Sequence, residues 1–273
     1  MTTEYTIFTG CSYTEGIGLP DVANDENLWV NILHNSVTEL SHTKLLNLGI
    51  GGSTNIEIFQ RSVDALCSYQ CKNLFVAWTS LYRYKFSLGA EVYDVTQYWS
   101  AGHKLIDVML NPYIKISKNF LTDLKNKFFS LHHDHYEILR ILGYTATLYR
   151  LAGITNTNVY FVNNMLPWDT GYFDQVIGEA RVPSDTTPYT QTLLNAETRD
   201  DEEFFQIYDS IHQGYVESQG LKNCMWLNLD SGFKENFMLD VGNDDIHPGP
   251  RSHRQFGEHL VDSYAKLQVS KQT

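Results

Sequence analysis

A serine near the amino terminus and a histidine near the carboxyl terminus are the residues of this sequence best suited to nucleophilic chemistry. The segment Gly10-Cys11-Ser12 follows a run of alternating apolar residues, and Asp244 and His247 stand three residues apart in "DDIHPG". A carboxylate at this spacing can accept the imidazole N–H across a turn and fix the tautomer of the ring. The other ring nitrogen can then take the proton of a serine hydroxyl. These residue types predict a relay of Ser12, His247 and Asp244.

Two members of this relay, Ser12 and Asp244, have alternatives. Cys11 is a rival nucleophile, because a thiol at the start of a helix ionises easily. Ser12 is also a residue type favoured as a helix N-cap. Asp245 is a second candidate for orienting His247, although its position closer to the ring gives it poorer geometry than Asp244.

Strands and helices alternate along the chain at short spacing. Apolar patterns predict strands at 4–9, 44–50, 73–80, 158–166 and 223–230, and helices at 27–40, 55–69, 135–154, 201–220 and 251–268. This alternation predicts an α/β protein with a mostly parallel, doubly wound sheet between two layers of helices. We expect a single domain over residues 1–273, with insertions at about 84–130 and 166–200.

The predicted sheet would bring distant polar segments to one edge. In open parallel sheets, ligands bind at the carboxyl ends of the strands near the point where the strand order reverses. Residues 10–12, 51–53 and 78–80 each follow a predicted strand, and residues 244–249 precede the last helix. We therefore expect these four segments to form one site.

In these segments the sequence resembles the SGNH, or GDSL-like, hydrolases. Gly10-Cys11-Ser12 matches the first block of that family with cysteine in place of its usual aspartate, Asn47 to Gly52 in "NLGIGG" matches the second, and "DDIHP" at 244–248 matches the last. The resemblance implies a three-layer α/β/α fold, with Ser12 as the nucleophile, His247 as the base and Asp244 as its orienting carboxylate. It also implies that the backbone N–H groups of Ser12 and Gly52 bind the oxyanion.

The third block departs from the family pattern. The family has Gly-x-Asn-Asp where this chain has "AWTSLYRY" at 77–84, so the asparagine that donates a side-chain hydrogen bond to the oxyanion is missing. Loss of one such donor costs about 100- to 1,000-fold in rate. Either Thr79, Ser80 or Arg83 replaces it, or the activity is low. Arg83 is also predicted to bind an anionic group of the substrate, with Cys11 and Trp78 as further substrate contacts.

Composition excludes several other functions. The formal net charge of −12 and the pI near 5.2 argue against binding to nucleic acid or to an anionic membrane. The absence of a signal-like start and of a long apolar run predicts a cytoplasmic protein. The four cysteines do not suggest a disulfide framework.

Two further patterns resemble binding sites without completing one. His132 and His135 in "LHHDHYE" have a spacing that zinc sites use, but a polar helix start explains them better. "IGGST" lacks the lysine of a phosphate-binding loop. No metal or organic cofactor is therefore expected. His253 and Arg254 are expected at the surface or behind the site.

The sequence thus predicts a serine hydrolase that cleaves a carboxylic ester through an acyl-enzyme. A small-molecule or carbohydrate ester, such as an O-acetyl group on a sugar, is the expected substrate class. Acyl transfer to another hydroxyl and a non-catalytic ligand-binding module on the same fold stay open as alternatives. The sequence makes no prediction of oligomeric state.

Overall fold

The structure is a computed structural model that describes residues 3–22, 25–80, 83–88, 91–95, 134–165, 226–228 and 232–270. Its centre is a sheet of β1 (Tyr5–Gly10), β2 (Lys44–Gly49), β3 (Cys71–Trp78) and β6 (Asn158–Asn163). All three strand pairs are parallel, and the strand order is β2-β1-β3-β6. The order reverses between β1 and β3, so the end of β1 is where a ligand site is expected.

Alternate residues of the strands enter two separate cores. Ile7, Leu74 and Phe161 belong to one buried cluster, whereas their neighbours Phe8, Phe75 and Tyr160 belong to the other. Successive side chains of a strand point to opposite faces of a sheet. The near-continuous apolar runs of these strands are therefore those of a sheet that is buried on both faces.

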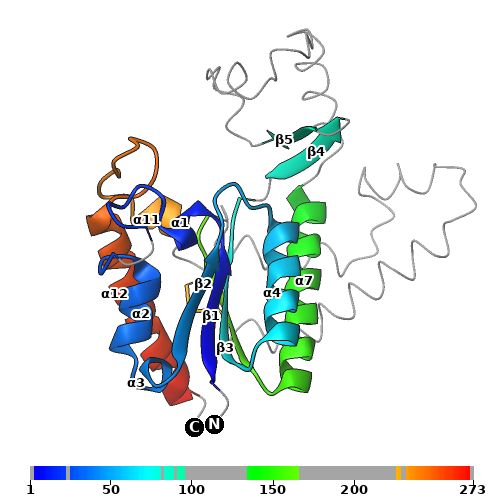
Figure 1. Ribbon diagram of the computed structural model, residues 1–273, viewed down its shortest axis with the longest axis vertical. Helices are drawn as coiled ribbons and strands as arrows, with labels where there is room; N and C mark the ends of the chain where they lie inside the picture. Colours follow the sequence, from blue (N-terminus) through cyan, green and yellow to red (C-terminus); the bar gives the residue numbers. More distant parts are fainter. Residues whose placement is uncertain are drawn as a thin grey trace, which may run out of the picture.

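Helices cover both faces of the sheet. In Figure 1, α4 (Asn55–Ser68) and α7 (Asp134–Thr155) lie on one side, and α2 (Trp29–Ser36), α3 (Thr38–Ser41) and α12 (Pro250–Ser270) lie on the other. This arrangement confirms the predicted three-layer α/β/α fold with a parallel sheet.

Two helices differ from their sequence patterns in detail. The predicted helix at 27–40 is interrupted at Val37, whose extended backbone separates α2 from α3. In α4, Ile58, Ser62 and Ala65 are buried, whereas Ile56 is 44% exposed. Phe59 stacks on Tyr144 of α7, the Ser62 hydroxyl contacts Thr9 of β1, and Ile58 and Ala65 enter the core cluster that the strands share.

Parts of the predicted insertions and of the carboxyl-terminal half lie outside the described residues. The first insertion contains an antiparallel pair, β4 (Tyr84–Leu88) and β5 (Glu91–Val95). The long loop at 166–200, the helix at 201–220, His132 and most of the strand at 223–230 are not among the described residues. Of that strand, Trp226 forms a parallel bridge with Phe161 beside β6.

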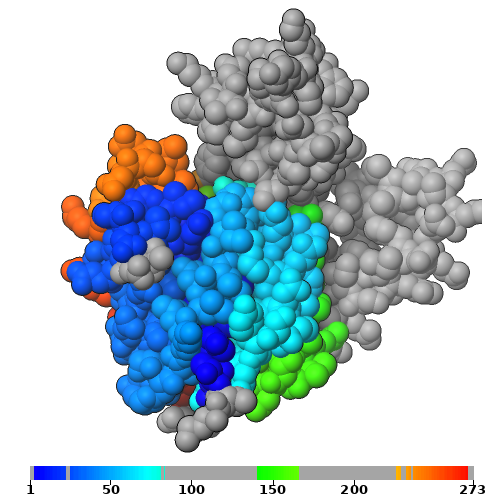
Figure 2. Space-filling view, viewed as in Figure 1, coloured from blue at the N-terminus to red at the C-terminus, as the bar shows by residue number. Residues whose placement is uncertain are grey.

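The loops at the carboxyl ends of the strands gather at one end of the molecule. α1 (Ser12–Glu15) follows β1 there, and α11 (Phe233–Asn236) and the segment 240–249 approach it from the other end of the chain. Figure 2 shows the orange carboxyl-terminal segment against the blue amino-terminal one. In the part of the chain that the structure describes, none of the helices is long and apolar enough to cross a membrane.

Candidate active site

Ser12 begins the short helix α1 directly after β1. Cys11 is the N-cap residue and makes no side-chain capping bond, so Ser12 is not the cap of this helix. Ser12 is 3% exposed, and its hydroxyl makes no hydrogen bond with the described residues. Its position at the reversal of strand order is the one predicted for a ligand site.

Two glycines allow α1 to turn sharply across the strand ends. Gly10 and Gly49 are paired at the ends of β1 and β2. A Cβ at Gly10 would lie 2.0 Å from Thr14 Oγ1, and one at Gly49 would lie 2.5 Å from the Glu15 nitrogen. Both positions therefore exclude a side chain, since real Cβ atoms do not approach other atoms so closely.

Side chains tie the loop after β2 to α1. Asn47 Nδ2 donates to Thr14 O at 2.8 Å, and Asn47 Oδ1 accepts the Gly49 N–H at 2.9 Å. Glu15 Oε2 accepts the Gly51 N–H at 2.5 Å. The next amide, that of Gly52, makes no hydrogen bond with the described residues, and its residue has a φ of 74°. A left-handed conformation of this kind is one that glycine adopts easily.

The loop then leads into α4 through a capping box. The Thr54 hydroxyl accepts the Glu57 N–H, and the Glu57 carboxylate accepts the Thr54 N–H. Thr54 is therefore the N-cap residue of α4. The reciprocal bonds satisfy helix N–H groups that would otherwise have no partner, and they fix where the loop ends.

Asp244 and His247 form a hydrogen-bonded pair in the segment before α12. His247 Nδ1 lies 2.5 Å from Asp244 Oδ2. Asp244 Oδ1 also accepts the backbone N–H groups of Ile246 at 3.1 Å and His247 at 3.0 Å. Asp245 has a left-handed φ of 59° and makes no such contact. The pair therefore consists of the two residues that the sequence favoured.

The electrostatics of this pair favour a charged Asp244. Burial acts to raise the pKa of this carboxyl, but the hydrogen bonds from His247 and Ile246 outweigh burial and lower its pKa to about 2. His247 Nε2 makes no hydrogen bond with the described residues, and the side chains of His247 and Asp244 are 21% and 34% exposed. The free ring nitrogen is thus an available proton acceptor.

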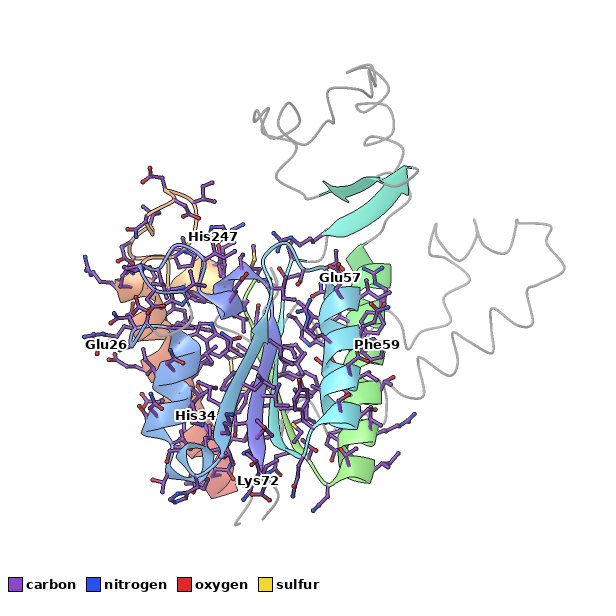
Figure 3. The ribbon with its side chains drawn as sticks, viewed as in Figure 1. Glu26, His34, Glu57, Phe59, Lys72 and His247 are labelled. Carbon is purple, nitrogen blue, oxygen red and sulfur yellow. The ribbon has the colours of Figure 1, made fainter. Side chains whose placement is uncertain are left out.

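The two halves of the site meet around α1. The Tyr13 and His247 rings lie 6.0 Å apart between centroids, and Asn243 N donates to Gly18 O at 2.9 Å. Figure 3 shows His247 at the same end of the molecule as Glu57. No hydrogen bond joins Ser12 Oγ to His247 Nε2. Catalytic hydrogen bonds are often long in the absence of a substrate.

The hydrogen bonds of Thr79 argue against its predicted role as an oxyanion donor. Thr79 is fully buried, its N–H donates to Asn55 Oδ1 at 2.9 Å, and its hydroxyl donates to Met165 Sδ at 3.4 Å. Asn55 Nδ2 donates in turn to the carbonyls of Thr79 and Ser80. The donors of Thr79 are already used in holding the loop after β3.

Ser80 and Arg83 continue from that loop. Ser80 is partly exposed, and Arg83 Nη1 lies 3.4 Å from Thr79 Oγ1 and 3.5 Å from Ser53 O. These contacts place the Arg83 guanidinium between the loops after β2 and β3. Both residues are partly exposed, so burial does not exclude either of them from the site.

Cys11 and Trp78, the other predicted substrate contacts, are wholly buried. Cys11 lies in the core cluster with Phe8 and Trp29, and Trp78 lies in the opposite cluster with Phe161. A side chain without exposed surface cannot contact a substrate or attack one in this conformation. Burial therefore argues against both substrate contacts and against Cys11 as the nucleophile.

Sequence reasoning missed two charged side chains behind the site. Glu15 binds the Gly51 N–H, as described above, and Arg61 on α4 reaches the ends of β1 and β2. Arg61 stands three residues after the buried Ile58. This helical spacing places Arg61 near the side of α4 that faces the sheet, and it is the signal from which its position could have been predicted.

His253 was expected at the surface or behind the site, and it is fully buried in α12. Neither ring nitrogen has a hydrogen-bond partner among the described residues, and the ring packs edge-on against Phe233. Burial lowers the pKa of His253 to about 3. Among the residues whose placement the structure gives, no group of three or more His, Cys, Asp or Glu side chains could hold a metal ion.

Comparisons with known proteins found similar solved structures at low sequence identity. No protein-family model and no curated protein matches the sequence. Among solved structures, the chain is similar to TesA, at 12% identity over 96% of this chain and 99% of that one, with a TM-score of 0.46. It is similar to the psychrotrophic esterase EstA from Pseudoalteromonas sp., at 12% identity over 97% and 98%, with a TM-score of 0.44.

A third similar solved structure has a lower TM-score. It is described as a lipolytic protein of the G-D-S-L family from Desulfitobacterium hafniense DCB-2. The two chains are 11% identical over 96% of this chain and 99% of that one, with a TM-score of 0.39. Scores and identities of this size assign no activity, so the function proposed below rests on the geometry of the site.

Proposed function

We propose that this protein is a serine hydrolase that cleaves a carboxylic ester. The observation that carries the proposal is the pairing of Asp244 with His247 Nδ1, on a segment that packs against the loop after Ser12. A carboxylate on Nδ1 leaves Nε2 as the basic nitrogen, which is the arrangement that a serine nucleophile requires. The oriented imidazole is partly exposed and its Nε2 makes no hydrogen bond with the described residues, so it is available to serve as the base in this proposal.

In the proposed reaction, His247 Nε2 takes the proton of the Ser12 hydroxyl while Ser12 Oγ attacks the ester carbonyl carbon. The tetrahedral oxyanion accepts hydrogen bonds from the free backbone N–H groups of Ser12 and Gly52. Collapse breaks the bond to the alcohol oxygen, which receives the proton from His247. A water molecule then attacks the acyl-enzyme with the same base, and Ser12 is regenerated as the acid leaves.

The third oxyanion donor is the weakest part of this site. Ser80 and Arg83 are the candidates that stay open, because Thr79 uses its own donors within the protein. If neither of them donates, two backbone N–H groups alone serve the oxyanion. We therefore expect a turnover below that of a site with three donors, by up to about 100- to 1,000-fold.

The proposed substrate is a small ester, with an O-acetyl group on a sugar as the first to be tried. Arg83, at the rim between two loops, is proposed to contact an anionic part of the substrate. Acyl transfer stays a prediction from the sequence, because the loop at 166–200 that would exclude water lies outside the described residues.

Labelling with a fluorophosphonate tests the proposal. We expect the wild type to be labelled at Ser12, as mapped by mass spectrometry, and the Ser12→Ala and His247→Ala variants to lose the label. Cys11→Ala tests the rival nucleophile and is expected to keep the label. Ser41→Ala is the matched control, because Ser41 is an exposed serine at the far end of the sheet.

The occupied donors of Thr79 also favour a second candidate, a binding module that has the fold without efficient chemistry. A well-folded wild type that takes no label would select this candidate and refute the hydrolase. Ser12 and Cys11 would then have only the structural role of starting α1.

A further inference from the structure

Arg61 joins three backbone segments at the carboxyl edge of the sheet. Its Nη1 donates to Gly10 O at 3.2 Å and to Leu48 O at 3.1 Å. Its Nη2 donates to Ser53 Oγ at 2.8 Å. One guanidinium thus connects the end of β1, the end of β2 and the loop that follows β2. None of the proposed reaction steps uses this side chain.

These contacts flank both of the proposed oxyanion donors. Gly10 comes two residues before Ser12, and Ser53 comes directly after Gly52. The Ser53 hydroxyl donates onward to Ile50 O at 2.7 Å, and the Ser53 N–H donates to the same carbonyl at 3.2 Å. The guanidinium therefore holds a closed turn from Ile50 to Ser53, with the Gly52 amide inside it.

A planar guanidinium suits this task better than another cation. Its N–H groups form a rigid fork, so that one side chain can reach several acceptors in fixed directions, whereas lysine offers a single nitrogen. Hydrogen bonds from a charged donor are about twice as strong as neutral ones. Burial acts to lower the pKa of Arg61, and the nearby carboxylates of Glu57 and Glu15 act to raise it.

We propose that Arg61 is a positioning residue that fixes the Gly52 N–H relative to the Ser12 N–H, so that both point at one oxyanion. The inference rests on the proposed function, because it assigns the two amides as donors. With the side-chain donor of the third block missing, the alignment of the remaining two amides matters more. A displacement of about 1 Å at a reacting centre can cost about 100-fold in rate.

Titration with a fluorophosphonate separates positioning from simple stabilisation. The end point counts the competent sites, and the labelling rate per site reports how well the oxyanion is bound. We expect Arg61→Met to keep most of its sites and to react about 10- to 100-fold more slowly per site. Arg61→Lys, which keeps the charge without the fork, is expected to fall between Arg61→Met and the wild type.

Ser62→Ala is the matched control on the same helix. The Ser62 hydroxyl contacts Thr9 Oγ1 at 2.7 Å, so its loss disturbs the packing of α4 on β1 without touching the loop after β2. We expect its labelling rate per site to match that of the wild type. A wild-type rate per site in Arg61→Met, whatever the number of sites, would overturn the proposal.

Hydrogen exchange distinguishes this inference from the proposed function. The Gly51 amide donates to Glu15 Oε2 on α1, and the Ser53 amide donates to Ile50 O within the loop. We expect both amides to exchange at least about 10-fold faster in Arg61→Lys, with no change in Ser62→Ala. If the wild type takes no label but these amides exchange faster, the hydrolase fails and the positioning of the loop stands. Unchanged exchange would refute the role of Arg61 even in an active enzyme.

Discussion

The two halves of the candidate site are held in different ways. On the nucleophile side, Asn47, Glu15 and Arg61 bind the backbone of segments distant in sequence, and most of these contacts are partly buried. On the base side, Asp244 accepts hydrogen bonds only from residues two and three positions further along, in an exposed turn. One half depends on tertiary contacts, and the other is largely a local turn.

This difference follows from what each half must do. Backbone amides that bind an oxyanion contribute only if they are held in place before the reaction. A histidine needs the correct tautomer and access to substrate, which one carboxylate and an exposed turn provide. We therefore expect damage on the base side to lower activity with little loss of stability. Damage on the nucleophile side should lower both.

The largest effect is expected at Asp244. Asp244→Asn removes the charge that orients His247 and stabilises its protonated form, and we expect kcat for an activated ester to fall about 10³- to 10⁴-fold. The free energy of unfolding at pH 7 should change by less than about 1 kcal/mol, because the pair is exposed. Asp245→Asn is the control and should retain kcat within about twofold. Equal losses in both variants would contradict the pairing.

The next effect concerns His253, which is buried in α12, the helix that follows the Asp244–His247 turn. Its ring stays neutral in the fold because burial lowers its pKa to about 3, although Asp25 and Asp240 act to raise that pKa. The unfolded chain binds a proton near pH 6.5, so stability is lost as the pH falls from 6.5 toward 3. We expect a loss of about 3 kcal/mol at pH 4 from this group.

Urea unfolding of the wild type and of His253→Leu at pH 7 and pH 4 measures this contribution. Leucine is close in size and takes no proton, so the variant should lose less stability on acidification. A drop of the same size in both proteins would show that His253 does not cause the acid sensitivity.

A smaller effect is expected at Asn47, which links α1 to the loop after β2. Asn47→Ala leaves a carbonyl and an N–H without their partners, and we expect a loss of about 1–3 kcal/mol in the free energy of unfolding. Because the Gly52 amide lies on the same loop, kcat should fall by about tenfold. A loss of activity with no change in the urea midpoint would contradict the expectation that damage on the nucleophile side lowers both activity and stability.

The smallest effect is expected at Arg83. Its two contacts are 3.4 and 3.5 Å long, so it is weakly held and contributes at most a rim interaction. For an ester with a carboxylate on its acyl group, Arg83→Ala should raise KM about two- to fivefold. The KM of a neutral ester of similar size should not change. Equal changes for both esters would remove Arg83 as an anion contact.

The sequence predicted the layers of the fold and the Asp244–His247 pair, because both depend on patterns that are local in the chain. Strands can be recognised in the sequence by their apolar runs. A carboxylate three residues from a histidine can reach the ring across a single turn. The proposed roles of these residues stay predictions until the labelling is done. The role of the Gly52 amide as an oxyanion donor was also predicted, but only through a resemblance to a family.

Contacts between distant segments account for the features that the sequence could not predict. Thr79 has the right residue type for a donor, and only the position of Asn55 and Met165 reveals that its donors are occupied. The burial of Cys11, Trp78 and His253 likewise depends on which helices pack against them. Arg61 was missed because a cation on an amphipathic helix usually faces water.

The paired glycines at the ends of β1 and β2 set a limit on how this protein can evolve. Neither Gly10 nor Gly49 supplies a reacting atom, yet one methyl group at either position would collide with α1. In a saturation mutagenesis library selected for activity, both positions would tolerate as little change as the nucleophile itself. Directed evolution toward new ester substrates therefore has to keep both glycines and introduce its substitutions at the rim of the site.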